Sequence, residues 1–466
     1  MCASYAAPSP RRRGAARLAA GTLVSGLLAA GALALAGPAA AAGTPQSQGG
    51  ATATIGALKT YGTAVIHERD GDYQVSAGLF EMSVDGGGML QTYCVDIHNP
   101  TQRDAKYHET PWSGTSLGAN KNAGRIRWIL QNSYPQVNDL TALAAKAGVR
   151  GLSEQDAAAG TQVAIWRYSD GAHVDAADPQ AEKLADYLEK SAQDLPEPNA
   201  SLTLDPPAVA GRPGHRLGPV TVHTGAGSVT VTPPADAAAG GVRVVDAKGR
   251  PVTSAEDGGQ VFFEVPEDAP PGAAELTVQA STTVPVGRAF TSDSRSQTQI
   301  LAGSSESTVT AAASATWAGK GAIPALSAAK DCAKGGLDIT AANKGDKEFA
   351  FELLGTRHTI AAGASRTVTV PLAEDQAYDF AITVLGDHGR RFTGVLDCKT
   401  QGPATGTTTQ TLSEPSPATA GTPVGTNLAD TGGTDTTPLI AAIGSSLLVL
   451  GATVLSIIRK KRTTQD

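Results

Sequence analysis

Tyr93-Cys94-Val95-Asp96 ends a series of short strand patterns, and Thr161-Gln162-Val163-Ala164-Ile165-Trp166 lies within a helical pattern of this 466-residue chain. From residue 54 to residue 96, short alternating apolar runs are interrupted by Asp-Gly turns, which is typical of a β-meander. From residue 121 to residue 195 the apolar period becomes helical. We therefore predict an α+β unit over residues 54–198, with the strands first and the helices after them.

The helical half of this unit divides into four predicted helices. Ser153 followed by Asp156 gives the third of them a capping signal at its start. In the fourth, leucines and alanines recur at helical spacing and mark the face that packs against the rest of the unit. The four ranges are Ala123–Asn132, Asn138–Ala147, Ser153–Tyr168 and Pro179–Leu195.

Cys94 and Gln162 are expected to meet where the strands and the helices pack together. On a strand, Cys94 points away from the face that carries Tyr93 and Val95, and so towards whatever covers the sheet. The helices are the natural cover. Gln162 lies on an apolar helical stripe beside Trp166, where a buried amide needs partners. Reaction with a facing thiol would satisfy that need.

A cysteine and a glutamine in contact can condense into an internal thioester. The thiolate attacks the amide carbon of Gln162 and ammonia leaves, provided that the fold holds the two groups together. Because a thiolate leaves far more easily than an amine, an incoming amine then forms an amide and frees Cys94. Asp96 or His98 is a candidate to take the proton of that amine. The predicted surroundings of the thioester, in which the two large aromatic residues exclude water, are Tyr93, Asp96, Thr161, Ala164 and Trp166.

The cysteine count points to the same residue. Cys2 is removed with the predicted leader, so an odd number of cysteines remains in a secreted chain. Cys332 and Cys398 bracket one candidate module and are predicted to form a disulfide, whose loop of roughly 65 residues contributes about 4 kcal/mol in the chain-entropy model. Cys94 is then alone in an oxidising compartment, where a free thiol is a liability.

Both ends of the chain carry address signals. Residues 1–42 combine an arginine-rich start, an apolar run and small residues, which predicts a cleaved secretory signal peptide. Near the other end, Leu428-Ala429-Asp430-Thr431-Gly432 precedes an uncharged stretch at 438–458 that is long enough to span a membrane. The basic tail at 459–466 follows at once and retains that end on the cytoplasmic side.

Two β modules and a stalk are predicted between these ends. Residues 201–317 carry short alternating runs separated by Pro-Pro pairs, which favours an all-β, immunoglobulin-like sandwich. A second sandwich is predicted over residues 323–399 and is closed by the disulfide. Residues 400–427 are mainly Thr, Pro, Ser, Gly and Ala, so we predict a disordered linker that spans the cell wall.

Composition limits the classes of function. The formal net charge is −7 with both signs interspersed, which gives no reason to expect nucleic acid or an anionic membrane surface as partner. Aromatic residues make up only 5% of the chain, so we expect modest cores rather than one large enzyme core. No pattern indicates a cofactor or a metal, and none is expected.

The motifs at Cys94 and Gln162 resemble the TQxA-type thioester domain of Gram-positive surface adhesins. The resemblance covers residues 54–198. It implies a Cys94–Gln162 cross-link that captures an amine-bearing target covalently, once per molecule and without enzymatic turnover. The target itself, a protein lysine or another surface amine, is not identified by the sequence.

The C-terminal pentapeptide, apolar span and basic tail resemble the sorting signal of sortase substrates, and Ala429 matches the LAxTG variant of actinobacteria. This resemblance implies that sortase cuts between Thr431 and Gly432 and passes Thr431 to a peptidoglycan precursor. We therefore expect a secreted protein that is anchored covalently to the cell wall and enters the membrane only through its sorting signal.

Two other interpretations stay open. Cys94 is inert in the first, and the chain is a structural or non-covalent binding protein of the wall. In the second, Cys94 works with His98 or His173 in a secreted cysteine hydrolase or transpeptidase. No oxyanion motif or nucleophile elbow supports the second interpretation.

Overall fold

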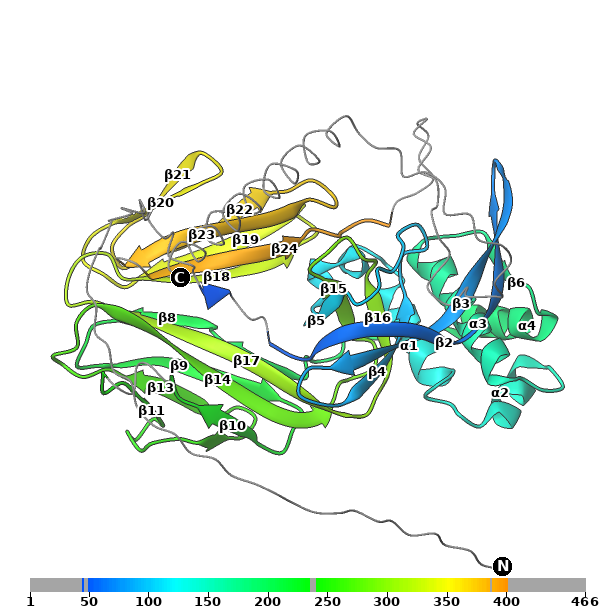
Figure 1. The fold of residues 1–466 in the computed structure, drawn as a ribbon, viewed down its shortest axis with the longest axis horizontal. Coiled ribbons are helices and arrows are strands. Elements are labelled where there is room, and N and C mark those ends of the chain that lie inside the picture. The colour runs from blue at the N-terminus through cyan, green and yellow to red at the C-terminus, as the bar shows by residue number, and fades with distance from the viewer. Residues whose placement is uncertain (1–43, 46–48, 235–239, 386–387, 401–466) are drawn as a thin grey trace, which may run out of the picture.

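Three units can be followed in the computed structural model, which describes residues 44–45, 49–234, 240–385 and 388–400. The first unit has its helices gathered at one end, the second is a two-sheet sandwich, and the third is a smaller β unit (Figure 1). β structure predominates, as the sequence predicts.

The predicted terminal segments lie outside the described residues. These are the signal peptide (1–42), the sorting motif (428–432), the membrane span (438–458) and the basic tail (459–466), and of the linker (400–427) only residue 400 is described. Among the described helices, none has the length and apolar character needed to cross a membrane.

The first unit is built on a seven-stranded sheet that draws its strands from two distant parts of the sequence. The pairing of its first two long strands closes the sheet on itself. The strands, in spatial order, are β3 (Gly71–Val84), β4 (Met89–Cys94), β16 (Gln299–Ser304), β15 (Ala289–Ser292), β5 (Lys106–Thr110), β2 (Thr52–Glu68) and β6 (Val174–Ala176).

The four predicted helices are confirmed, with small shifts at their ends. The third helix begins after Ser153, whose side chain forms the predicted capping box with Asp156. The fourth ends at Ser191 rather than at Leu195. The helices are α1 (Ala123–Asn132), α2 (Leu140–Ala147), α3 (Glu154–Ser169) and α4 (Pro179–Ser191), preceded by the short 3-10 helices η1 (Trp112–Gly114) and η2 (Ser116–Gly118).

Helix α3 is the central helix of the first unit. Every residue from Ala157 to Trp166 is buried, so this part of the helix is surrounded by protein on all sides rather than on one stripe. Small residues allow its neighbours to approach closely: a Cβ atom at Gly160 would lie 2.5 Å from the carbonyl oxygen of Ala181 in α4. Gln162 is therefore carried into the interior by its helix.

The second unit lends two strands to the first. Its strands β14 (Gly272–Thr283) and β17 (Glu306–Trp317) form a long antiparallel hairpin. Residues 284–305, at the tip of this hairpin, leave the sandwich and supply β15 and β16, which pair with β5 and β4. The sandwich predicted at 201–317 includes these residues, because a buried strand pattern does not reveal which sheet the strand joins.

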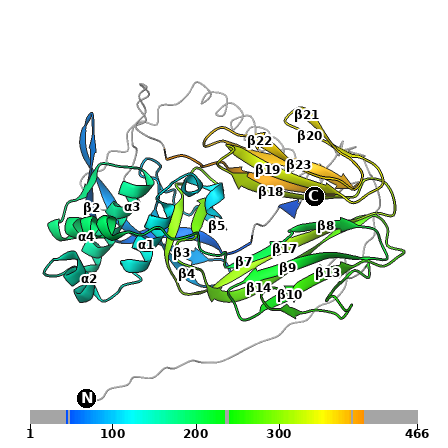
Figure 2. The same ribbon diagram turned by 180° about the vertical axis from the view of Figure 1, so that it is seen from behind.

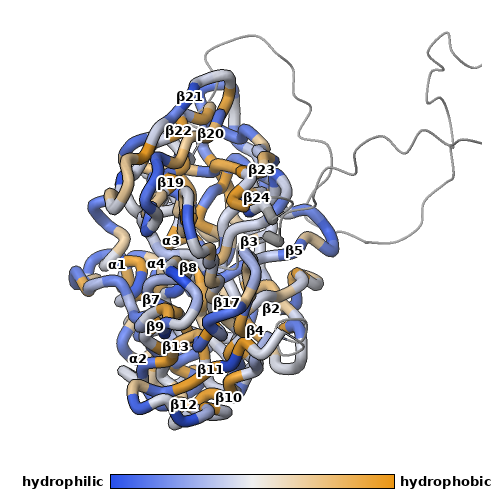
Figure 3. Tube along the Cα trace, turned by 90° about the vertical axis from the view of Figure 1, so that its left-hand side faces the viewer, coloured by the Kyte–Doolittle hydropathy of each residue, from blue (hydrophilic) through white to orange (hydrophobic). Residues whose placement is uncertain are grey.

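The rest of the second unit is the predicted sandwich. Hydrophobic and hydrophilic segments alternate along its strands (Figure 3). Its apolar core is continuous with that of the first unit. One sheet contains β12 (Ser254–Ala255), β10 (Val229–Thr232), β14, β17 and β8 (Ala208–Gly211), and the other contains β11 (Arg243–Val245), β13 (Gln260–Glu264), β9 (Arg216–Thr224) and β7 (Leu202–Asp205).

The third unit has a hydrophobic core of its own and contains the predicted disulfide between Cys332 and Cys398. It lies alongside the second unit in both views (Figures 1 and 2). Its sheets are formed by β18 (Pro324–Asp331), β19 (Gly336–Asn343) and β22 (Ser365–Pro371), by β20 (Phe349–Leu353) and β21 (Thr356–Ile360), and by β23 (Ala377–Leu385), β24 (His388–Val395) and β1 (Thr44–Pro45).

A buried ion pair joins the hairpin tip to the first unit. Arg288 donates from Nε to Oε1 of Glu109 at 2.8 Å, and only 4% and 2% of these residues are exposed. The Glu109 carboxylate also accepts the backbone N–H of Ala51 and of Ser201. Since Glu109 lies on β5, this single carboxylate connects the first unit, the hairpin tip and the start of the sandwich.

Removal of Arg288 should destabilise the whole arrangement, because it leaves the buried carboxylate of Glu109 without its countercharge. We expect Arg288→Met to lower the free energy of unfolding by about 3 kcal/mol in urea denaturation. Arg250→Met is the matched control and should cause no measurable loss, because Arg250 pairs with Asp246 at the surface. Equal stabilities of the two variants would contradict this role for Arg288.

Candidate functional site

The side-chain amide of Gln162 is paired with the backbone of Cys94. The Cys94 N–H donates to Oε1 of Gln162 at 3.0 Å, and Nε2 of Gln162 donates to the carbonyl oxygen of Cys94 at 2.9 Å. Both residues are buried, with 3% of Cys94 and 1% of Gln162 exposed. The structure thus brings together the two predicted residues, with the glutamine amide directly beside the residue that carries the thiol.

The thiol does not face the helices, contrary to our expectation. The hydroxyl of Tyr93 is the group on the helical side, where it donates to the carbonyl oxygen of Tyr134 at 2.9 Å. Sγ of Cys94 instead lies 3.3 Å from Nε2 of Gln299 and 3.9 Å from Oγ1 of Thr101. Tyr93 and Cys94 still lie on opposite faces of the strand, so the expectation was wrong about which face the helices cover. Gln162 reaches the backbone of Cys94, the last residue of β4.

The other predicted neighbours belong to the packing around this contact. Thr161 donates to the carbonyl oxygen of Ala157 at 2.7 Å, one turn earlier in α3. Ala164 is completely buried. Trp166 is also buried, and its indole N–H has no hydrogen-bond partner among the residues that the structure describes. Tyr93 and Trp166 are therefore core residues of the first unit.

The environment of Cys94 disfavours the thiolate. Burial raises the pKa of its thiol to about 12, although hydrogen bonds from Gln299 and Thr101 act in the opposite direction. At neutral pH the sulfur therefore carries its proton, and a nearby group must accept that proton before the sulfur can attack. Cys94 is the one free cysteine among the residues that the structure describes.

Two buried carboxyls lie close enough to the sulfur to affect it. Burial raises the pKa of Asp96 to about 7, against hydrogen bonds from the N–H of His98 and from Asn99. Burial also raises the pKa of Asp170 to about 8, and repulsion between the two carboxylates adds to this shift. Groups with pKa values near neutrality can both accept and donate a proton, which suits acid–base chemistry.

Asp170 connects the end of helix α3 to the segment after Cys94. It is the C-cap of α3, and its Oδ1 accepts the N–H of Ile97 at 3.2 Å. A negative charge at the C-terminus of a helix is unfavourable, which also favours the protonated form. No local pattern in the sequence signals that Asp170 lies close to Cys94, because the two residues are far apart along the chain.

The structure adds Thr92, Thr101 and Gln299 to the site. Gln299 is fully buried, and its Oε1 accepts the hydroxyl of Thr92 at 3.0 Å. Thr101 also accepts a hydrogen bond from Gln297 at 2.7 Å. The sequence does not point to Gln299, because this residue lies 205 positions beyond Cys94. It belongs to the hairpin tip, which the sequence predicts as part of the sandwich at 201–317.

No histidine is a hydrogen-bond partner of Cys94 within the described part of the chain. His98 contacts the site only by donating its backbone N–H to Asp96. Burial lowers the pKa of the His98 ring, which leaves it neutral at physiological pH. The paired cysteine and histidine that a cysteine hydrolase or transpeptidase needs are therefore not assembled at Cys94.

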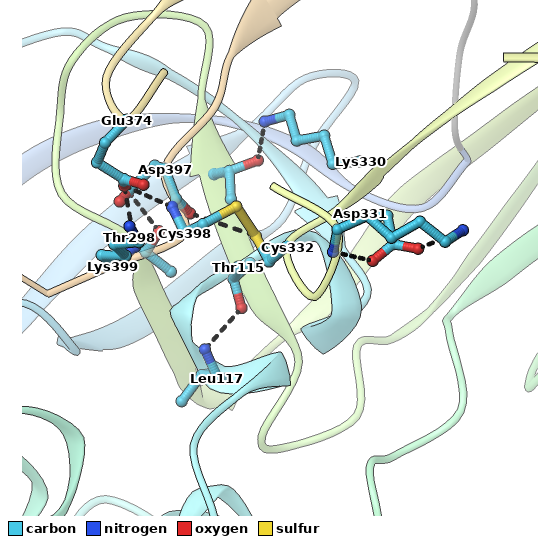
Figure 4. Close-up of a disulfide and its surroundings, with 12 residues drawn as sticks. Thr115, Leu117, Thr298, Lys330, Asp331, Cys332, Glu374, Asp397, Cys398 and Lys399 are labelled. Carbon is cyan, nitrogen blue, oxygen red and sulfur yellow. Dashed lines mark hydrogen bonds and ion pairs between the residues drawn. A yellow bond between two sulfur atoms is a disulfide. The ribbon is translucent and has the colours of Figure 1, made fainter. Parts of the chain in front are cut away.

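A group of carboxyls in the third unit meets the edge of this site. Glu374, Asp375 and Asp397 offer oxygen atoms that lie within 4.8 Å of one another. Glu374 accepts the N–H of Cys398 and of Lys399, and Asp397 accepts the hydroxyl of Thr298 at 2.8 Å (Figure 4). These hydrogen bonds account for the positions of Glu374 and Asp397 without a metal ion, and we assign no ion to the group.

Comparison with known proteins found one family model that is similar to part of this chain. Residues 91–194 match the family model of the thioester domain, a range that includes both Cys94 and Gln162. The match does not extend to Gln299. Among curated proteins, none is significantly similar to this chain in sequence.

Three solved structures of bacterial proteins are similar at low TM-scores. The Bacillus anthracis TIE protein is 14% identical over 74% of this chain and 64% of its own, with a TM-score of 0.27. The thioester domain of the Enterococcus faecium TIE86 protein is 16% identical over 57% of this chain and 96% of its own, with a TM-score of 0.27. The thioester domain of the Staphylococcus aureus TIE protein is 10% identical over 57% and 98%, with a TM-score of 0.18. This chain thus spans less than two thirds of the length of the first structure.

The raised pKa of Asp170 predicts a pH dependence of stability. The folded chain binds more protons than the unfolded chain between the ordinary carboxyl pKa, about 4, and the raised value of about 8. The free energy of unfolding therefore falls as the pH rises through this window. Asp170→Asn, an uncharged mimic of the protonated acid, should be more stable than the wild type by a few kcal/mol at pH 8 and nearly equal to it at pH 4.

Denaturation midpoints of the two proteins between pH 4 and pH 8 test this expectation. Asp379→Asn is the control, because the Asp379 carboxylate is exposed beside Arg391, which lowers its pKa. This control should gain nothing at pH 8. Parallel pH profiles for Asp170→Asn and the wild type would show that Asp170 is not protonated in the fold.

Proposed function

We propose that this protein is a cell-surface adhesin that binds an amine-bearing target covalently through an internal thioester between Cys94 and Gln162. The observation that carries the proposal is the pairing of the Gln162 amide with the Cys94 backbone in a buried site. The match of residues 91–194 to the thioester domain supports it independently.

Formation of the thioester consumes the glutamine amide. The Cys94 thiol gives up its proton, sulfur bonds to the side-chain carbonyl carbon of Gln162, and the C–N bond breaks. The nitrogen leaves as ammonia after it takes up one proton, so the proton lost by sulfur is returned and charge is balanced. Asp96 and Asp170 are the groups suited to carry this proton from sulfur to nitrogen.

Capture of the target releases the sulfur. A neutral amine attacks the same carbonyl carbon, an amide forms between Gln162 and the target, and Cys94 regains its proton from the amine. Each molecule reacts once, because capture consumes the thioester and leaves the target bonded to Gln162. The protein is therefore a reagent rather than an enzyme, and no cofactor enters the reaction.

Signals at the two ends of the chain direct the protein to the cell surface, where this chemistry takes place. The signal peptide at 1–42 directs secretion, and the motif at 428–432 directs sortase to join Thr431 to a peptidoglycan precursor. The β units and the linker at 400–427 then extend the thioester domain away from the wall. The partners in this proposal are sortase, the wall precursor and a surface amine such as a protein lysine.

Mass spectrometry of the intact secreted protein tests the thioester. The wild type should be lighter than its encoded sequence by one ammonia, beyond the loss expected for the disulfide between Cys332 and Cys398. Treatment with methylamine should add one methylamine and expose one thiol, because a small amine can enter a buried thioester. Cys94→Ala and Gln162→Ala should show the encoded mass and no reaction with methylamine.

Gln155→Ala is the matched control, because Gln155 is an exposed residue on the same helix. It should keep both the ammonia loss and the methylamine reaction. An encoded mass and a titratable thiol in the untreated wild type would instead favour a structural or non-covalent wall protein. Repeated turnover of an amide or ester substrate would favour a cysteine hydrolase.

A further inference from the structure

We propose that Gln299 is a catalytic residue of this site, whose side-chain N–H stabilises the Cys94 sulfur while it carries negative charge. This inference rests on the proposed thioester and adds a residue from outside the segment that matches the thioester domain. It also gives the hairpin tip of the second unit a role in the chemistry.

Gln299 touches the reacting atom directly. In the register between β16 and β4, Gln299 lies opposite Cys94, so the two side chains share one face of the sheet. Nε2 of Gln299 lies 3.3 Å from Sγ of Cys94, and the residue is fully buried. A hydrogen bond that is shielded from water acts more strongly on a charged atom than the same bond at the surface.

The orientation of the Gln299 amide is fixed by its other contacts. Its Oε1 accepts the hydroxyl of Thr92 at 3.0 Å, which leaves the NH₂ group to face the sulfur. The same Nε2 lies 3.5 Å from Oγ1 of Thr101, which itself lies near Sγ. These contacts surround the sulfur with polar groups that are bonded to one another.

The backbone beside Gln299 is held from two directions. The carbonyl oxygen of Thr298 accepts the N–H of Val95 at 3.2 Å, next to the reacting cysteine. The hydroxyl of Thr298 donates to Oδ2 of Asp397 at 2.8 Å, immediately before the disulfide residue Cys398 (Figure 4). The third unit thus fixes the segment that positions the donor.

An uncharged hydrogen-bond donor beside the sulfur favours both steps, the formation of the thioester and the capture of the amine. During thioester formation the sulfur becomes negative as its proton leaves, and during amine capture it becomes negative as the C–S bond breaks. Asp96 and Asp170 both disfavour a negative sulfur when they are ionised. The Gln299 N–H offsets this repulsion by donating a hydrogen bond to the negative sulfur. Gln299 keeps all its covalent bonds and its protons, so the atoms and charges of the reaction balance as before.

Gln299 is not placed to be the acyl partner itself. The atom that it directs at sulfur is its amide nitrogen, whereas a nucleophile must reach the carbonyl carbon. The bond from Thr92 opposes the rotation that would exchange the two. Gln162 therefore remains the residue that supplies the acyl group, and Gln299 acts on the sulfur.

The test uses Gln299→Met in the full-length chain, because methionine has nearly the length of glutamine and no N–H. The reaction of the thioester with methylamine should be slower by about tenfold to a hundredfold, the effect of one hydrogen bond to a charged atom. In a Gln162→Ala background, where Cys94 stays a thiol, Gln299→Met should also slow alkylation by iodoacetamide several-fold at pH 8.

Two further variants separate this effect from a loss of structure. Gln136→Met is the matched control, because Nε2 of Gln136 donates to the carbonyl of Ala302 on the same strand and does not touch the sulfur. It should react at the wild-type rate. Thr92→Val keeps Gln299 but frees its amide to rotate, and should slow both reactions by a smaller factor.

The possible results are distinct. Wild-type rates for Gln299→Met in both assays would overturn the role of Gln299 and leave the thioester intact. An ammonia loss that persists in Gln162→Ala and disappears in Gln299→Met would overturn it by making Gln299 the acyl partner. If the wild type contains no thioester, the proposed function fails, and slower alkylation in the thiol background still supports the donor role.

Discussion

The structure depends on the meeting of one glutamine side chain with one strand end. The Gln162 amide forms hydrogen bonds with the backbone N–H and the backbone carbonyl of Cys94, which a neighbouring strand would otherwise use. A buried amide without partners would be costly, and so would an unpaired strand end in the interior. Each satisfies the other, so helix α3 is held against β4 at the position where the two reacting groups must be close.

The site is assembled from three parts of the chain that are distant in sequence. The first unit supplies Cys94 and Gln162, the hairpin tip of the second supplies Gln299, and Asp397 of the third holds the backbone beside it. Glu109 and Arg288 fix the hairpin tip from its other end. Such an arrangement suits the thioester proposed above, because it keeps Cys94 and Gln162 away from water.

Local patterns were enough to predict the four helices, the capping box at Ser153 and the contact between Cys94 and Gln162. These features depend on residues a few positions apart, or on the simple rule that strands and helices bury their apolar faces together. The orientation of the Cys94 thiol, the strands at 289–304 and Gln299 could not be predicted in this way. These features depend on long-range strand pairing, which no local period records.

Peptide mapping of the untreated secreted protein tests the central claim most directly. Digestion under mildly acidic conditions and tandem mass spectrometry should recover one species in which the peptide that contains Cys94 is joined to the peptide that contains Gln162, with the loss of one ammonia. Recovery of the two peptides separately, with a free thiol at Cys94 and an intact amide at Gln162, would contradict the account.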